Sequence, residues 1–187
     1  MTPKRFIPAL LATLLTTVLL TACGGGGGGG GDTGGGGHQS PYTPDGSVPA
    51  STANLLTLVY DTSTSDADRA VFYLELTNVE NGFNPAADAT AVAADLTYEP
   101  LMLTFVSFAP APGISGIAIA APTPGSTNRL VLAITGPVAG RLGTLTFNKA
   151  GLAGNTDMTF DAVSFVGPEG SVLAARRLTG QGGRLEI

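Results

Sequence analysis

Apolar and polar residues alternate with a period of two over much of the chain from Asn54 to Ile187. Gly, Pro, Asn and Asp interrupt this alternation every few residues, and the only helical candidate, 85–91, is too short to form a layer. Many short alternating segments with turn residues between them are typical of an all-β sandwich or barrel. The expected strands are 54–60, 70–79, 91–98, 101–108, 114–120, 128–135, 141–148, 157–166, 171–178 and 183–187.

The alternation also assigns each side chain to a face, because successive residues of a strand point to opposite sides of the sheet. About 134 residues suffice to bury a core without disulfides or metal. The residues expected to face this core in three of the strands are Val92, Ala94, Leu96, Tyr98, Leu130, Leu132, Ile134, Leu145 and Phe147.

A corner is expected at Glu99-Pro100. Proline cannot donate to a sheet ladder, and it biases the preceding residue toward an extended conformation. We therefore expect one strand to end here and the next to begin at Leu101, with Leu103 and Phe105 buried.

The first 22 residues have the pattern of a secretory signal peptide. Lys4 and Arg5 are followed by an uncharged, largely apolar run from Phe6 to Leu20. This run is shorter than the roughly 20 residues that span a bilayer, and it fits the apolar region of a signal sequence.

The signal segment ends Leu20-Thr21-Ala22-Cys23, which resembles the lipobox of bacterial lipoproteins. The resemblance implies a diacylglycerol on the Cys23 sulfur, cleavage before this residue and acylation of the new N-terminus. Two or three acyl chains form a stable membrane anchor. Gly24, rather than Asp, follows the cysteine, which favours the outer over the inner membrane of a bacterial cell envelope.

Residues 23–53 are expected to form a flexible tether after the signal peptide. Positions 24–31 and 34–37 are all Gly, and 38–53 are rich in Pro, Ser, Thr, Asp and Gly. Such composition buries too little apolar surface to offset chain entropy. The expected organisation is a signal peptide over 1–22, the lipidated tether over 23–53 and a β-sandwich over 54–187.

The charged and metal-binding residue types exclude several functions. A net charge of −5 excludes nucleic acid as an electrostatic partner. One Cys and one His exclude an intramolecular disulfide and a Cys/His zinc site, and leave little room for triad catalysis. We expect no enzyme, cofactor or metal site. Asp61, Asp66, Asp68 and Asp88 offer a Ca²⁺ site as an alternative to the preferred solvated acidic loops.

Five segments in order resemble a cohesin domain. They are VFYLELTNVENGF, VAADLTYEPLMLTFVSF, GRLGTLTFNKAG, MTFDAVSFVGPEGSVL and the terminal GGRLEI. The resemblance covers about 54–187. The resemblance implies a jelly-roll sandwich of about nine strands, akin to cellulose-binding carbohydrate modules. It also implies a protein partner, since cohesins bind the dockerin module of another protein on a sheet face.

The resemblance places strands 91–98, 128–135 and 141–148 in one sheet, which we take as the partner-binding sheet. Small outward side chains leave its surface open, and two charged residues can orient a partner. The expected partner-binding residues are Asp95, Thr97, Arg129, Val131, Thr144 and Thr146.

Two alternatives to protein binding stay open. One is a carbohydrate-binding module for a polysaccharide, with Tyr60 and Tyr73 as stacking residues. Aromatic residues make up only 6% of the chain and Trp is absent, so carbohydrate binding ranks after protein binding. The other is a structural subunit of an envelope assembly.

Overall fold

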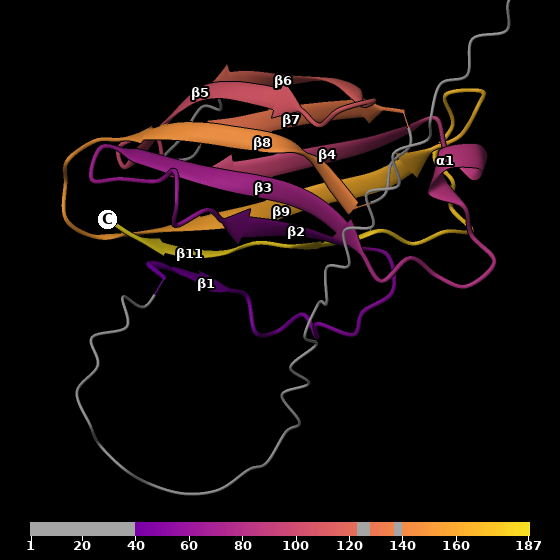
Figure 1. The fold of residues 1–187 in the computed structure, drawn as a ribbon, viewed down its shortest axis with the longest axis horizontal. Helices are drawn as coiled ribbons and strands as arrows, with labels where there is room; N and C mark the ends of the chain where they lie inside the picture. The colour runs from indigo at the N-terminus through magenta and orange to yellow at the C-terminus, as the bar shows by residue number, and fades with distance from the viewer. Residues whose placement is uncertain (1–39, 123–127, 137–139) are drawn as a thin grey trace, which may run out of the picture. The chain divides into compact units, whose positions relative to one another are not determined.

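The computed structural model describes residues 40–122, 128–136 and 140–187, which belong to one compact unit. Within these residues, eleven strands form two sheets that face each other, and the helix α1 (Pro85–Asp88) has only four residues (Figure 1). The expected all-β jelly-roll sandwich is confirmed. None of the described helices is long and apolar enough to cross a membrane.

One sheet has six strands in the spatial order β1-β11-β9-β4-β7-β6. All its neighbouring strands are antiparallel. Their bounds are β1 Tyr42–Pro44, β4 Ala91–Tyr98, β6 Ser115–Pro122, β7 Asn128–Thr135, β9 Asn155–Val166 and β11 Gly183–Glu186.

The other sheet has five strands in the spatial order β10-β2-β3-β8-β5. Only the short β10 pairs in parallel, with β2. The bounds are β2 Leu55–Tyr60, β3 Arg69–Thr77, β5 Leu103–Pro110, β8 Gly140–Lys149 and β10 Thr179–Gln181.

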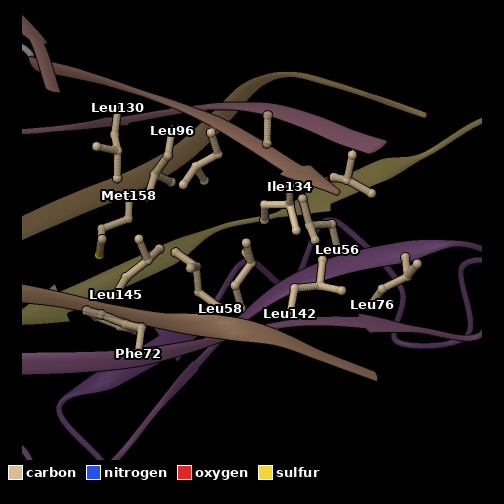
Figure 2. Close-up of a cluster of buried hydrophobic side chains, with 14 of the residues drawn as sticks. Leu56, Leu58, Phe72, Leu76, Leu96, Leu130, Ile134, Leu142, Leu145 and Met158 are labelled. Atoms are coloured by element: carbon tan, nitrogen blue, oxygen red, sulfur yellow. The ribbon is translucent and has the colours of Figure 1, made fainter. Parts of the chain in front are cut away.

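The core lies between the two sheets, and both supply it by period-two alternation (Figure 2). Leu96 and Leu130 point inward from the six-stranded sheet toward Phe72 and Leu145 of the other. Phe147 is the centre of an aromatic cluster, with edge-on contacts to Phe72, Tyr98 and Phe105. Every residue assigned to the core from the alternation of β4, β7 and β8 is buried.

The expected strand over 171–178 is wrong. Only Val172 makes an isolated bridge, to Val166, and residues 174–176 form a turn. The two leucines of this segment that contact the core, Leu173 and Leu178, are five residues apart, a spacing that does not fit strand alternation. The strand in this part of the chain is instead β10, which we did not predict.

The start of the folded domain at Asn54 is also wrong. Residues 42–44 form β1, which pairs with β11, and Tyr42 is buried in the core. The single large apolar ring in an otherwise polar segment makes this pairing favourable. The residues of the predicted signal peptide and tether up to position 39, Cys23 and His38 included, lie outside the described residues.

The corner at Glu99-Pro100 is a tight turn rather than a direct passage between strands. The amides of Met102 and Leu103 both donate to the Glu99 carbonyl, at 3.1 and 3.0 Å. Leu101 therefore lies in the turn and is exposed, whereas Leu103, which begins β5, is fully buried. Phe105, expected in the core, is only half-buried at its edge.

Candidate functional site

The outer face of the six-stranded sheet consists of the side chains that alternate with the core residues of β4, β6, β7 and β9. The register aligns them in rows across the sheet. One row is Ile117, Ala133, Ala93 and Ser164, and the next is Ile119, Val131, Asp95 and Ala162. These rows make a flat surface of small and aliphatic side chains.

Asp95 and Arg129 form an ion pair on this face. They lie on the neighbouring strands β4 and β7, two positions apart along the ladder, because Asp95 pairs with Val131 and Arg129 pairs with Thr97. The Arg129 guanidinium therefore reaches diagonally across the two strands to the Asp95 carboxylate. The Asp95 side chain retains 17% of its exposure and that of Arg129 retains 48%. The pair is open to solvent on one side, which leaves the guanidinium accessible to a further acceptor.

Ile117 and Ile119 form the apolar margin of the outer face. They point outward from β6, the last strand of the sheet, and are 59% and 56% exposed. Val131 lies opposite Ile119 on β7 and is half-buried. The ion pair is thus bordered on one side by aliphatic surface, the combination of apolar area and a few charges found in protein interfaces.

The six residues expected to bind a partner do not share one face. Asp95, Thr97, Arg129 and Val131 lie together on the six-stranded sheet. Thr144 and Thr146 lie on β8, in the five-stranded sheet, and alternate with the core residues of that strand. The assumption that 141–148 joins the other two strands is wrong, because β8 pairs with β3 and β5 instead.

The five-stranded sheet carries a separate polar cluster on its outer face. The Arg141 guanidinium stacks on the Tyr73 ring, 3.3 Å from its centroid, and lies 3.8 Å from a Glu75 carboxylate oxygen. The Tyr73 hydroxyl donates to the Asp61 carboxylate. The sequence identified Tyr73 only as a candidate stacking residue and did not predict this cluster, because the 66-residue separation between Glu75 and Arg141 conceals their pairing.

Asp61 is the best-satisfied carboxylate in the described residues. Its oxygens accept hydrogen bonds from the Ser63 hydroxyl at 2.6 Å, the Thr64 hydroxyl at 2.6 Å and the Ser63 amide at 2.9 Å, besides that from Tyr73. These bonds, the Ser63 hydroxyl first, hold the pKa of Asp61 well below its usual range. The Asp61 carboxylate thus holds the loop residues Ser63 and Thr64 in place. Because its oxygens already accept these hydrogen bonds, few lone pairs are left to bind a cation.

Two of the other three carboxylates considered for Ca²⁺ are also engaged locally. Asp66 accepts from the Asp68 amide at 3.0 Å, and Asp88 accepts from the Asn84 amide at 2.8 Å at the start of α1. No group of three or more His, Cys, Asp and Glu side chains suited to a metal occurs in the residues that the structure describes. Hydrogen bonds within the loops thus engage Asp61, Asp66 and Asp88.

A hollow of about 570 Å³ lies beside β1, β9 and β11. Its lining includes Phe160, Gly182 and the ion pair of Asp157 with Arg184, whose two bonds measure 2.7 and 3.2 Å. The Arg184 bonds lower the pKa of Asp157. Because Asp157 and Arg184 satisfy each other and are exposed, neither of these two charges is left unpaired for a ligand.

Comparison with known proteins connects this sandwich to one kind of module. No family model matches the chain, and no curated protein matches it. Solved structures do match. The complex of a CaDoc0917 variant with CaCohA2 superposes with a TM-score of 0.52 at 14% identity, over 71% of this chain and 98% of the matched chain.

Two further matches are of the same kind. The solution structure of CaCohA2 from Clostridium acetobutylicum gives a TM-score of 0.50 at 15% identity, covering 72% of this chain and 94% of that one. The Coh-OlpC–Doc435 complex, a type I cohesin–dockerin complex from Clostridium thermocellum, gives a TM-score of 0.45 at 12% identity. The match covers 72% of this chain and 92% of the matched chain. Such low identities show the fold alone. The described domain is therefore a cohesin-like sandwich, as the resemblance in sequence predicts.

Proposed function

We propose that this protein is a binding module of cohesin type, held at the bacterial cell envelope by lipid on Cys23, which engages a protein partner. The partner docks on the outer face of the six-stranded sheet. The observation that carries the proposal is the exposed aliphatic surface of Ile117, Ile119 and Val131 beside the Asp95–Arg129 ion pair. Burial of the aliphatic side chains supplies affinity, and the charges orient the partner.

A comparison with a solved complex supports a protein as the ligand. CaCohA2, whose fold this domain shares, was solved together with a second module, CaDoc0917. We extend this to a dockerin-like module, or another envelope protein, as the partner here. The same fold supports a non-enzymatic role, and the carboxylates of Glu75, Asp61, Asp66 and Asp88 are committed to an ion pair or to loop hydrogen bonds.

The aromatic residues argue against the carbohydrate alternative. Tyr60 packs edge-on against the buried Phe72 ring, with centroids 5.3 Å apart. Tyr73 has the Arg141 guanidinium stacked on its ring. Sugar platforms need free, coplanar ring faces, and these two residues, the candidates from the sequence, do not provide such a pair.

The test of the binding face exchanges the charges of its ion pair. The double variant Asp95→Arg with Arg129→Glu keeps a pair within the protein but reverses the charges shown to a partner. Exposed substitutions of this kind change stability by about 0.5 kcal/mol or less. We expect the variant to retain its melting temperature and to lose capture of partners that the wild-type protein retains from envelope extracts.

A matched control makes the same exchange on the opposite sheet, Glu75→Arg with Arg141→Glu. This control should capture partners as the wild-type protein does. If the control loses capture and the Asp95/Arg129 exchange does not, the partner binds the five-stranded sheet. If glycans bind and no protein does, the carbohydrate module replaces the proposal.

The anchor is tested through Cys23. The Cys23→Ser variant should carry no labelled fatty acid, should leave the detergent phase and should accumulate as unprocessed precursor. A neighbouring change, Thr21→Ser, keeps the small residues of the motif and serves as the control. Label on the Cys23→Ser protein would contradict the lipoprotein assignment.

A further inference from the structure

Four strands form the edges of the two sheets, and three of them carry features that prevent pairing with another chain. β1 and β10 have three residues each, and β1 ends in Pro44. β5 is interrupted by a bulge at Val106 and ends in Pro110. Short strands, bulges and prolines are the devices by which proteins protect their sheet edges.

The fourth edge strand, β6, is neither short nor bulged; like β1 and β5 it ends in a proline, Pro122, but no proline lies from Ser115 to Ala121. It spans eight residues, and its register with β7 runs without a shift from Ser115 to Pro122. No residue from Ile114 to Pro122 is charged. Figure 1 shows β6 at the rim of the domain, and the ladder that the structure describes for it goes to β7 alone. A long, regular, uncharged edge strand is a template for strand pairing.

The residue sizes along β6 are complementary to those of a second copy in antiparallel orientation. When the pairing is centred on Ala118, Ile117 of each copy lies opposite Ile119 of the other, and Gly116 lies opposite Ala120. Both isoleucines point to the outer face, so the four side chains meet as cross-strand pairs of β-branched residues. The inner face brings together only small residues.

We propose that two copies of this protein associate through β6, which joins their six-stranded sheets into one continuous antiparallel sheet across a two-fold axis. A second copy fits this edge because identical strands satisfy a two-fold axis when they run antiparallel. The uncharged strand also opposes no like charges, although the chain carries a net charge of −5. The association closes as a dimer, because the opposite edge of the same sheet is the short β1.

Such a ladder buries less area than a standard stable interface, so we expect a weak dimer that depends on concentration. The proposal goes beyond the proposed function and does not depend on it. Its consequence is that two outer faces lie side by side on one sheet.

The first test is register-specific cross-linking in the full-length chain. Ile117→Cys and Ile119→Cys are made in two differently tagged copies that are expressed together. Opposite residues of an antiparallel ladder have Cα atoms about 4.5–5.5 Å apart, within the range that a disulfide bridges. Mild oxidation of membranes should link the two tags, and each single variant expressed alone should link less.

The control pair is Leu101→Cys with Val172→Cys, which are 71% and 63% exposed and lie away from β6. The extent to which this pair cross-links measures disulfides that form by random collision between two copies. Linking of the β6 pair at or below the control level overturns the proposal.

The second test uses Ile119→Lys, which places a charge on the edge strand. Its matched control, Val172→Lys, makes a similar change at another exposed position. In sedimentation equilibrium over about 1–500 µM, a range suited to weak association, the wild type and the control should show a dimer. Ile119→Lys should reduce the dimer constant at least about tenfold, which is 1.4 kcal/mol, with an unchanged melting temperature. A wild-type chain that stays monomeric throughout, or a dimer that Ile119→Lys leaves intact, contradicts the proposal.

Discussion

Tyr42 packs edge-on against Phe72, with ring centroids 5.1 Å apart and an angle of 76° between the rings. The contact joins the first strand of the domain to the centre of the core, because Phe72 also contacts Phe147. It is reinforced by the ladder between β1 and β11. The segment ahead of Asn54 is therefore part of the sandwich.

This contact predicts that removing the N-terminal segment destabilises the domain. A chain that starts at Asn54 should melt well below one that starts at Ser40, because it loses a large buried ring. Tyr42→Ala in the longer chain should lower the free energy of unfolding by about 3–5 kcal/mol. Each kcal/mol lost lowers the melting temperature by about 2–4 °C. Calorimetry of the three proteins measures the effect.

Tyr42→Phe separates the ring from its hydroxyl. The Tyr42 hydroxyl oxygen is buried and has no hydrogen-bond partner in the described part of the chain, and burial raises the pKa of this phenol. Removing a buried, unpartnered hydroxyl is neutral or stabilising by about 1 kcal/mol. Equal losses for Tyr42→Ala and Tyr42→Phe would contradict the packing described here.

The aromatic cluster predicts unequal effects of two phenylalanines. Phe147 is fully buried and contacts three other rings, whereas Phe105 contacts it from the edge of the core, 5.7 Å away. Phe147→Ala should cost about 3–5 kcal/mol, and Phe105→Ala about 1–2 kcal/mol because this side chain is half-exposed. Urea unfolding measures both. A larger cost for Phe105→Ala would place its ring in the centre of the core.

Asp61 predicts a specific sensitivity to acid. Its pKa is lower in the folded chain than in the unfolded chain, chiefly because of the Ser63 hydroxyl. The unfolded chain therefore takes up the proton first as the pH falls below about 4. The stabilisation by Asp61 is present above that pH and is lost as the pH approaches the folded-state pKa.

The Asp61→Asn variant should show a shallower loss of unfolding free energy than the wild type between about pH 4.5 and pH 2.5. Ser63→Ala should lie between the two, because it removes one of the bonds that lower the pKa. Urea titrations at a series of pH values give the slopes. Identical slopes for all three proteins would show that the loop carboxylate is not held as the structure has it.

Gly182 predicts a strict requirement for glycine beside β11. A Cβ atom added there would lie 1.9 Å from the Met158 carbonyl oxygen, a backbone atom that cannot move away without disrupting β9. Gly182→Ala should destabilise the domain by more than about 2 kcal/mol. Gly46→Ala, where the added atom meets nothing within 4 Å, is the control and should be nearly neutral. Thermal melts of both variants test the close approach of the two strands.

The strands with strict alternation were predictable from the sequence. In β4 and β7 every second residue is apolar, and burial of that face forces the observed register, since a slip of one residue would expose it. The outward positions of Asp95 and Arg129 follow from the same pattern. Their ion pair does not, because it depends on which strands become neighbours.

The errors arose where local pattern does not determine structure. Alternation assigns a face to Thr144 and Thr146 but not a sheet, and the pairing of β8 with β3 and β5 is a tertiary choice. Tyr42 gave too weak a signal, because a single apolar residue among prolines and glycines resembles a linker. Leu101 was misplaced because the hydrogen bonds to the Glu99 carbonyl delay the next strand by two residues.

The position of β1 has a mechanical consequence. A pull on the chain ahead of Ser40 acts first on an edge strand that is joined to β11 by only three residue pairs. The bonds from Gln181 to the carbonyls of Asp45 and Val48, both 3.0 Å, then bear the load. Residues 42–54, which lead from β1 to β2, measure about 45 Å when fully extended at about 3.5 Å per residue. Force applied to this end of the domain therefore reaches β1 before it reaches the central strands of either sheet.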